Sequence, residues 1–340
     1  MPRLAAKDGH ALCNTNAVST GQAALALVDV SRLLTFAVHA AALACEGYAT
    51  NPLIFDERIA ARRPAAFQQE ASAVFRRILE GSYLHDPDSA RRIQDPLSFR
   101  CLAQIVGVAL RAHADARREV EIELNAMGDN PIVLLPDGEI VSTANFHTPT
   151  IALVFDVLAI AFTHLATACF QRIARLLSSE SSGLPRYLSP IGGASAGYVP
   201  VQKLCAALLG EVRLRASPAS LDAMPVSEAV EDVAPQTPLA IAKLTEQLEP
   251  LRILLAVEAL VAAQAVDLRA GARLAAPTRR LYDAVRAVAA PLYTDREPAP
   301  DIERVVALTV DDTLRAELAG SLAGLELPFL PRYSALESVR

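Results

Sequence analysis

Two long apolar segments, residues 23–44 and 150–170, constrain the fold of this chain more than any other feature. Each is long enough to cross a membrane, yet each carries ionisable residues near its middle, such as Asp29 and His39 in the first and Asp156 in the second. Charged groups at the centre of a bilayer are costly. We therefore expect both segments to be core helices of a soluble, cytoplasmic protein rather than membrane spans.

The apolar residues of the chain are mainly those that favour helices. Hydrophobic residues make up 52% of the sequence but aromatic residues only 5%, so alanine, leucine and valine dominate. Because alanine and leucine favour helix, we predict an all-α fold with a long central helical bundle. Helices this apolar also bury surface against other subunits, so we expect a homo-oligomer. The expected helices cover residues 19–46, 66–80, 98–126, 149–179, 197–216, 238–268 and 278–290.

One stretch breaks the helical pattern. Two short apolar runs, residues 132–135 and 139–141, flank a Pro-Asp-Gly turn and predict a β-hairpin. No linker or internal repeat divides the chain, so we expect one helical domain over residues 1–340. Its parts would be an N-terminal loop (1–18), the central bundle (19–270) and C-terminal helices (271–340).

Charge and cysteine usage argue against several kinds of partner. The net charge of −6 is spread along the chain and the basic runs are isolated pairs, so no nucleic-acid-binding surface is expected. The five cysteines are far apart, and no two histidines lie four positions apart, so we expect no metal site. Such cysteines suit a reducing cytosol as small buried side chains.

Several side chains next to turns are candidate site residues, although each also has an ordinary structural explanation. Arg100 could bind a substrate carboxylate through two parallel hydrogen bonds, or could form a structural ion pair with an acid on a helix. Glu231 could act as a general base, but acidic residues in such a loop usually lie on the surface. Asn14 could equally be a helix N-cap. Asn145 and Phe146 follow the predicted hairpin and could face either the bundle or solvent.

Taken together and in order, the polar clusters resemble a known pattern. They are Lys7-Asp8-Gly9-His10-Ala11-Leu12-Cys13-Asn14, Gln94-Asp95-Pro96-Leu97-Ser98-Phe99-Arg100-Cys101, Gly128-Asp129-Asn130-Pro131, Asn145-Phe146-His147, Ser182-Gly183-Leu184-Pro185-Arg186, Ser217-Pro218-Ala219-Ser220-Leu221-Asp222 and Glu231-Asp232. From about Arg3 to about Ile302, the chain resembles the aromatic amino acid ammonia-lyase family, and most closely its histidine ammonia-lyase branch.

This resemblance implies an all-α homotetramer that eliminates ammonia from an aromatic L-amino acid and leaves an arylacrylate. The family uses an electrophile, 4-methylidene-imidazole-5-one, which forms by cyclisation of an internal Ala-Ser-Gly and assists removal of a weakly acidic β-proton. By resemblance, Arg100 would bind the substrate carboxylate and Asn14 would contact the electrophile, with Gln94 supporting both. The remaining candidates would line the substrate pocket, with Phe146 beside the electrophile, Asn145 among the substrate-binding residues, and Glu231 near the substrate amine or ring.

The chain also departs from the family pattern. It contains no Ala-Ser-Gly, so we expect the N-terminal domain that carries this tripeptide to be absent. Leu97 stands where the family has a catalytic tyrosine, and leucine can neither donate nor accept a proton. Val233 replaces a histidine near the substrate side chain, and Thr15 replaces a glycine at a turn beside the electrophile.

Three hypotheses fit these matches and departures. In the first, which we favour, a partner subunit bearing Ala-Ser-Gly supplies the methylidene-imidazolone, and the site forms between chains. In the second, the protein is a lyase without this electrophile and uses a simple base such as Glu231. In the third, it is a non-catalytic structural or regulatory homologue. The first two predict that a small carboxylate-bearing, amino acid-like ligand binds at Arg100.

Overall fold

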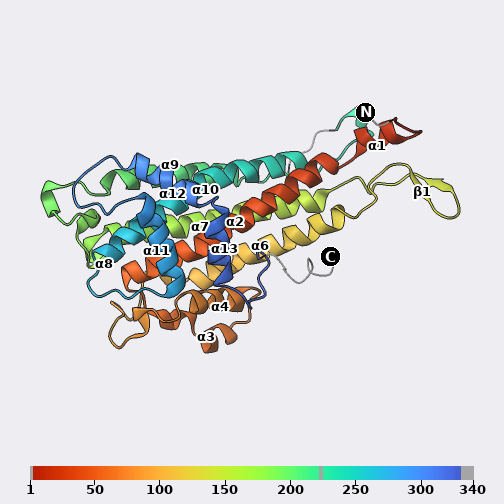
Figure 1. The fold of residues 1–340 in the computed structure, drawn as a ribbon. Coiled ribbons are helices and arrows are strands. Elements are labelled where there is room, and N and C mark those ends of the chain that lie inside the picture. Colours follow the sequence, from red (N-terminus) through yellow and green to blue (C-terminus); the bar gives the residue numbers. More distant parts are fainter. Residues whose placement is uncertain (1–2, 222–224, 331–340) are drawn as a thin grey trace.

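The computed structural model of this protein describes residues 3–221 and 225–330. Its main body is an elongated bundle of long helices that lie side by side along one axis (Figure 1). These are α2 (Ala17–Tyr48), α6 (Leu102–Glu123), α7 (Pro149–Leu177), α9 (Val199–Arg215) and α10 (Thr237–Asp267). The predicted all-α fold with a long central bundle is therefore confirmed.

Helix α10 forms the centre of the bundle, because it packs against α2, α7 and α9 and is buried along most of its length. Its buried face is rich in alanine, and such small side chains let helices approach closely. The contact with α2 is tightest at Gly47, where a Cβ atom would lie 2.9 Å from the Cβ atom of Ala265. Alanine is therefore common in these helices because its small side chain lets them pack closely.

Both apolar segments noted in the sequence lie in this core. Helices α2 and α7 are long and apolar enough to span a membrane, yet 67% and 61% of their most apolar windows are buried inside the protein. Two buried ionisable side chains in these helices, Asp156 and His39, have protein partners. The Asp156 carboxylate accepts hydrogen bonds from the amides of residues 219–220. The buried His39 ring is hydrogen-bonded to Thr35 and Ser321, and burial lowers the pKa of His39 to about 4.

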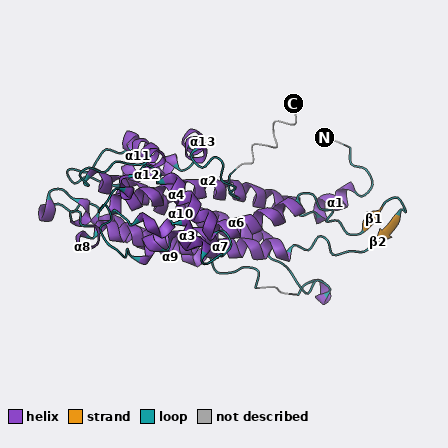
Figure 2. Cartoon of the chain, turned by 90° about the horizontal axis from the view of Figure 1, so that it is seen from below, coloured by secondary structure: helices purple, strands orange, loops and turns teal. Residues whose placement is uncertain are grey.

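Shorter helices pack around this bundle (Figures 1 and 2). They are α1 (Asp8–Asn14), α3 (Glu57–Ala61), α4 (Gln68–Ile78), α5 (Leu97–Arg100), α8 (Ser179–Ser182), α11 (Ala276–Val288), α12 (Ala299–Leu308) and α13 (Asp312–Gly320). Helix α4 packs against α6, α11 and α13 pack against α2, and α12 packs against α10. These contacts make the bundle thicker toward the end where α2 stops and leave it slender toward the end where α2 begins (Figure 1).

Two local predictions need correction. The helix expected over residues 98–126 is divided at Cys101, whose amide bonds back to the Leu97 carbonyl and closes the single turn of α5 before α6 begins. The loop expected over residues 1–18 contains α1 and the start of α2. The aspartate at the start of α1 is favourable there because it faces the positive end of the helix dipole.

The predicted β-hairpin is confirmed and projects beyond one end of the bundle (Figures 1 and 2). Its strands are β1 (Ile132–Leu134) and β2 (Glu139–Val141), and they pair antiparallel with Ile132 opposite Val141. Gly138 has a φ of +69°, a left-handed conformation that glycine adopts without strain. Leu135 and Ile140 are exposed, so the hairpin presents apolar side chains that nothing in residues 3–221 or 225–330 covers.

Candidate functional site

The six side chains that the sequence predicts for a site lie at opposite ends of the bundle. Asn14, Asn145, Phe146 and Glu231 lie at the end where α2, α7 and α10 begin, which we call the α1 end. Gln94 and Arg100 lie at the end where α2 stops and α5 packs, the α5 end. Helix α2 has 32 residues, so these ends are about 48 Å apart at the helical rise per residue. One chain therefore does not bring the two groups together.

At the α1 end, Asn16 ties three segments together. Its side-chain nitrogen donates to the carbonyl oxygen of Phe146 at 2.7 Å and to the carboxylate of Glu123 at 3.0 Å. Neither Asn14 nor Asn16 caps a helix through its side chain, which was the structural alternative for this position. The Asn14 amide instead lies 2.8 Å from the His10 ring, one helical turn away.

A hollow of about 430 Å³ lies beside Asn14 between the start of α2 and the end of α6. Its wall includes the side chains of Asn14, Asn16 and Glu123, and its edge is closed by Asp129. The Asp129 carboxylate forms an ion pair with Lys7, which lowers the pKa of Asp129. This arrangement offers amide donors and carboxylate acceptors to a small polar group.

The other candidates at the α1 end are exposed. Asn145 and Phe146 follow the hairpin, and the Phe146 ring is 39% exposed. Glu231 lies exposed in the loop between α9 and α10, where its backbone pairs with Val226. This loop is anchored at its start by Asp156, whereas Asp222 of the same loop lies outside the described residues.

At the α5 end, the candidate segment is held from behind by buried contacts. The buried Asp95 carboxylate accepts a hydrogen bond from the Asn51 amide at 2.8 Å, and burial raises the pKa of Asp95. The Phe99 ring stacks on Tyr48 with 4.3 Å between centroids. The turn of α5 is therefore fixed against the end of α2.

These contacts turn the opposite side of α5 outward. Gln94 is exposed and Arg100 is partly exposed. Within the described residues, the Arg100 guanidinium forms no hydrogen bond or ion pair, so the structural ion pair that we considered for it is not found. Leu97 is 60% exposed and Ile93 is 93% exposed on the same segment. The surface thus combines an uncommitted cation with two branched apolar side chains.

Neighbouring arginines at this end are already engaged. Arg91 donates to the carbonyl oxygen of Ser181, and Arg92 donates to that of Glu180. Arg269 donates to the carbonyl oxygens of Gly47 and Tyr48 at the end of α2. Among these guanidinium groups, Arg100 is the one with all its donors available for a carboxylate.

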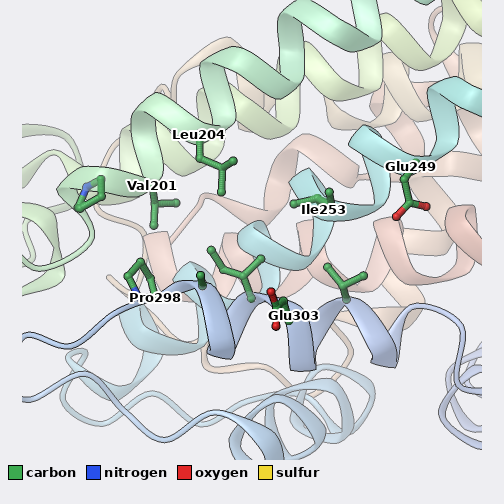
Figure 3. A pocket seen from close by; sticks show the side chains of 10 residues that line it. Val201, Leu204, Glu249, Ile253, Pro298 and Glu303 are labelled. Atoms are coloured by element: carbon green, nitrogen blue, oxygen red, sulfur yellow. The ribbon is translucent and has the colours of Figure 1, made fainter.

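An apolar groove lies elsewhere and does not fit the predicted chemistry. It has a volume of about 450 Å³ and lies between α9, α10 and α12, with Leu204, Ile253 and Ile302 among its lining residues (Figure 3). Its ionisable groups are the acids Glu249 and Glu303, so it offers no cation to a carboxylate. It contains none of the six predicted residues, and we place the candidate site at the two ends of the bundle instead.

The sequence did not single out two buried charges that support α5. Arg172 of α7 and Glu258 of α10 form an ion pair inside the bundle, and Arg172 also donates to the carbonyl oxygen of Ser98. The signal that would have found them is a charge that interrupts an apolar run: Glu258 is the one charged residue between Arg252 and Asp267 in α10, and Arg172 is the first charged residue after Asp156 in α7. Such charges are rarely buried unless paired.

Comparisons with known proteins agree with the fold and the motif order. The family model described as aromatic amino acid lyase matches residues 1–287. The histidine ammonia-lyase of Symbiobacterium thermophilum is 38% identical over 323 residues, which cover 95% of this chain and 64% of that protein. The histidine ammonia-lyase of Anaeromyxobacter dehalogenans is also 38% identical, covering 92% of this chain and 62% of that protein. The chain thus spans less than two thirds of the length of these relatives.

Solved structures show the same likeness. The ergothioneine-degrading enzyme ergothionase of Treponema denticola superposes with a TM-score of 0.85 at 30% identity, covering 88% of this chain and 60% of that one. The histidine ammonia-lyase of Trypanosoma cruzi has a TM-score of 0.86 at 28% identity, covering 97% of this chain and 61% of that one. Sequence and structure therefore point to the same group of proteins.

Proposed function

This chain belongs to the aromatic amino acid lyase family, and we propose that it forms the helical, carboxylate-binding part of a lyase that eliminates ammonia from an amino acid to give an acrylate. The observation that carries this proposal is Arg100. It lies in the family's Gln94–Cys101 pattern, faces outward, and has no partner among the described residues. A guanidinium with all its donors available is suited to a bidentate carboxylate contact.

We propose that the two groups of candidate residues meet between copies of this chain. Because the two groups of candidates lie about 48 Å apart along α2, they meet only if the α1 end of one copy lies against the α5 end of another. Antiparallel pairing of two copies gives that arrangement, and two such pairs make a closed tetramer. Exposed apolar side chains on the long helices support association: Val18 and Leu25 on α2, and Leu153, Val157 and Ile160 on α7.

We further propose that the electrophile comes from outside these 340 residues, on a partner chain, because they contain no Ala-Ser-Gly. The hollow beside Asn14 has room for a five-membered ring and offers amide donors, so this end of the chain fits a methylidene-imidazolone. When bound, that group supplies an electron-accepting centre. Asn14 would then donate a hydrogen bond to it, and Phe146 would exclude water from its face.

The remaining steps fall to side chains at both ends. Arg100 would orient the substrate through its carboxylate, and Gln94 would hold the adjacent polar groups. Leu97 can only pack against the substrate, so the base that accepts the β-proton would have to come with the partner chain that supplies the electrophile. In this chain we assign Glu231 to the substrate amine, where a carboxylate can bind the ammonium and accept a proton from it.

The test is a paired activity measurement. The chain would be purified alone and together with a polypeptide that carries an Ala-Ser-Gly domain of the family, and acrylate formation from histidine, tyrosine and phenylalanine would be followed by ultraviolet absorbance. We expect product only from the mixture, together with a hetero-oligomer in native mass spectrometry. Product from the chain alone would favour the simple-base mechanism. An inactive homo-oligomer isolated from its own cells would overturn the proposal.

A further inference from the structure

A buried ion pair lies directly behind the turn that carries Arg100. The guanidinium of Arg172, on α7, binds both carboxylate oxygens of Glu258, on α10, and the second of these contacts measures 3.0 Å. The side chains of Arg172 and Glu258 are 3% and 0% exposed. Burial by itself lowers the pKa of Arg172, but the Glu258 carboxylate more than offsets this effect and raises the pKa, so the guanidinium remains charged.

The third arm of the guanidinium reaches α5. Nη1 of Arg172 donates to the carbonyl oxygen of Ser98 at 3.2 Å. A single-turn helix leaves its last carbonyl groups without partners inside the helix, so this contact satisfies one of them. Within residues 3–221 and 225–330, it is the one side-chain hydrogen bond that joins α5 to α7.

Stability alone does not explain a charged pair in this position. Its surroundings are apolar enough that burial raises the pKa of the Cys45 thiol to about 12 and that of Cys169 well above its ordinary value. Removing two charges from water is costly, and well-packed apolar residues in place of a buried pair are often neutral or stabilising. The feature that an apolar pair could not reproduce is the donor to Ser98.

We infer that Arg172 and Glu258 are positioning residues, which hold α5 in the orientation that presents Arg100 and Gln94 at the surface. Asp95 and Phe99 tie the turn to α2, whereas Arg172 ties it to α7 and α10. Without the Arg172 contact, α5 keeps its attachment to α2 but can pivot on it. We call the contacts that join Glu258, Arg172 and Ser98 the clamp. The role of α5 in binding a carboxylate rests on the proposed function, whereas the clamp itself does not.

Amide hydrogen exchange of the full chain tests the clamp without requiring activity. The reporters are the amides of Phe99, Arg100 and Cys101, which bond within the turn. In Arg172→Lys the charge remains, but one ammonium cannot bind both Glu258 oxygens and also Ser98. We expect these three amides to exchange about tenfold faster or more, the scale of losing one hydrogen bond to a charged group. The double variant Arg172→Met/Glu258→Leu should show the same acceleration at an unchanged melting temperature.

Arg286→Lys is the matched control. Arg286 forms a similar buried pair with Asp267 and also donates to one carbonyl oxygen, that of Ala289, but it does not contact α5. It should leave the three reporter amides unchanged. Reporter exchange at the wild-type rate in Arg172→Lys would overturn the inference. If the amides of α13 exchanged faster by the same factor as those of α5, the inference would also be overturned, because the whole protein would then be less stable. If the clamp is found but no carboxylate ever binds, the proposed function fails and the clamp stands.

Discussion

At the α5 end of the bundle, buried contacts hold the candidate segment from three sides, whereas at the α1 end the candidates lie on an exposed helix end and two loops. Asp95, Phe99 and Arg172 restrain the turn that bears Arg100. At the other end, Asn16 donates hydrogen bonds to two other segments, and Glu231 lies in a loop that Asp156 anchors at its start. Contacts within one chain therefore hold the turn that bears Arg100 in place and leave the candidates at the α1 end on less restrained segments.

The largest expected effect tests the clamped end. Glu258→Leu leaves the Arg172 charge buried without a partner, and breaking a buried pair in this way costs about 3–5 kcal/mol. Denaturant unfolding followed by circular dichroism should show this loss. Glu231→Gln, at the exposed end, should leave the unfolding curve unchanged. Similar losses of stability in both variants would contradict the conclusion that the α5 end is more tightly held than the α1 end.

Acid should lower the stability of the folded protein through protonation of His39, which is buried in α2. Its folded pKa of about 4 lies below the ordinary histidine value of 6.5, so the unfolded chain binds a proton that the folded chain excludes. Stability from this group is complete above pH 6.5 and is lost as the pH falls toward 4, by about 3 kcal/mol at most. Unfolding titrations of wild type and His39→Gln across this range measure the effect. Equal slopes in the two proteins would show that His39 is not its source.

Replacing Arg100 should weaken ligand binding without changing the stability of the protein. Arg100→Ala should lower the affinity of the assembled protein for a carboxylate ligand about 100-fold, the value of a charged hydrogen-bond pair. The melting temperature should not change, because Arg100 has no partner in the described part of the chain. Calorimetry with a substrate amino acid provides the measurement, and Arg58→Ala, which alters an exposed arginine paired with Asp56, is the control. Unchanged affinity would exclude Arg100 as the carboxylate ligand.

The smallest effect concerns the α1 end. Asn16→Ala removes the donor to the Phe146 carbonyl and should cost about 1 kcal/mol. Limited proteolysis should then cut faster near residues 143–147. Asn125→Ala is a suitable control, because the Asn125 side chain lies just after α6 and donates to the Glu121 carbonyl of that nearby helix rather than to another segment. Faster cleavage in the control as well would mean that this end is loose regardless of Asn16.

Much of the fold was predictable because it depends on local pattern. The apolar periodicity of residues 149–179 predicted α7, observed at Pro149–Leu177, and the Pro-Asp-Gly turn predicted the hairpin. Asp156 in an apolar run argued for a protein core, and its carboxylate indeed bonds to backbone amides there. The break at Cys101 was not predicted, because helical periodicity continues through it and only the packing of Phe99 on Tyr48 turns the chain.

By itself, the amino-acid sequence determined the helical class, the order of the motifs and the chemical types at Asn14, Gln94, Leu97 and Arg100. Those features follow directly from the composition of the chain and the spacing of its motifs. Only the tertiary structure decided that the candidates lie at opposite ends of a long bundle, that Arg100 has no partner within residues 3–221 and 225–330, and that a buried pair supports its turn. The physical reason is that these are relations between residues far apart in the chain. They arise from how rigid helices of fixed length pack, which no local pattern records.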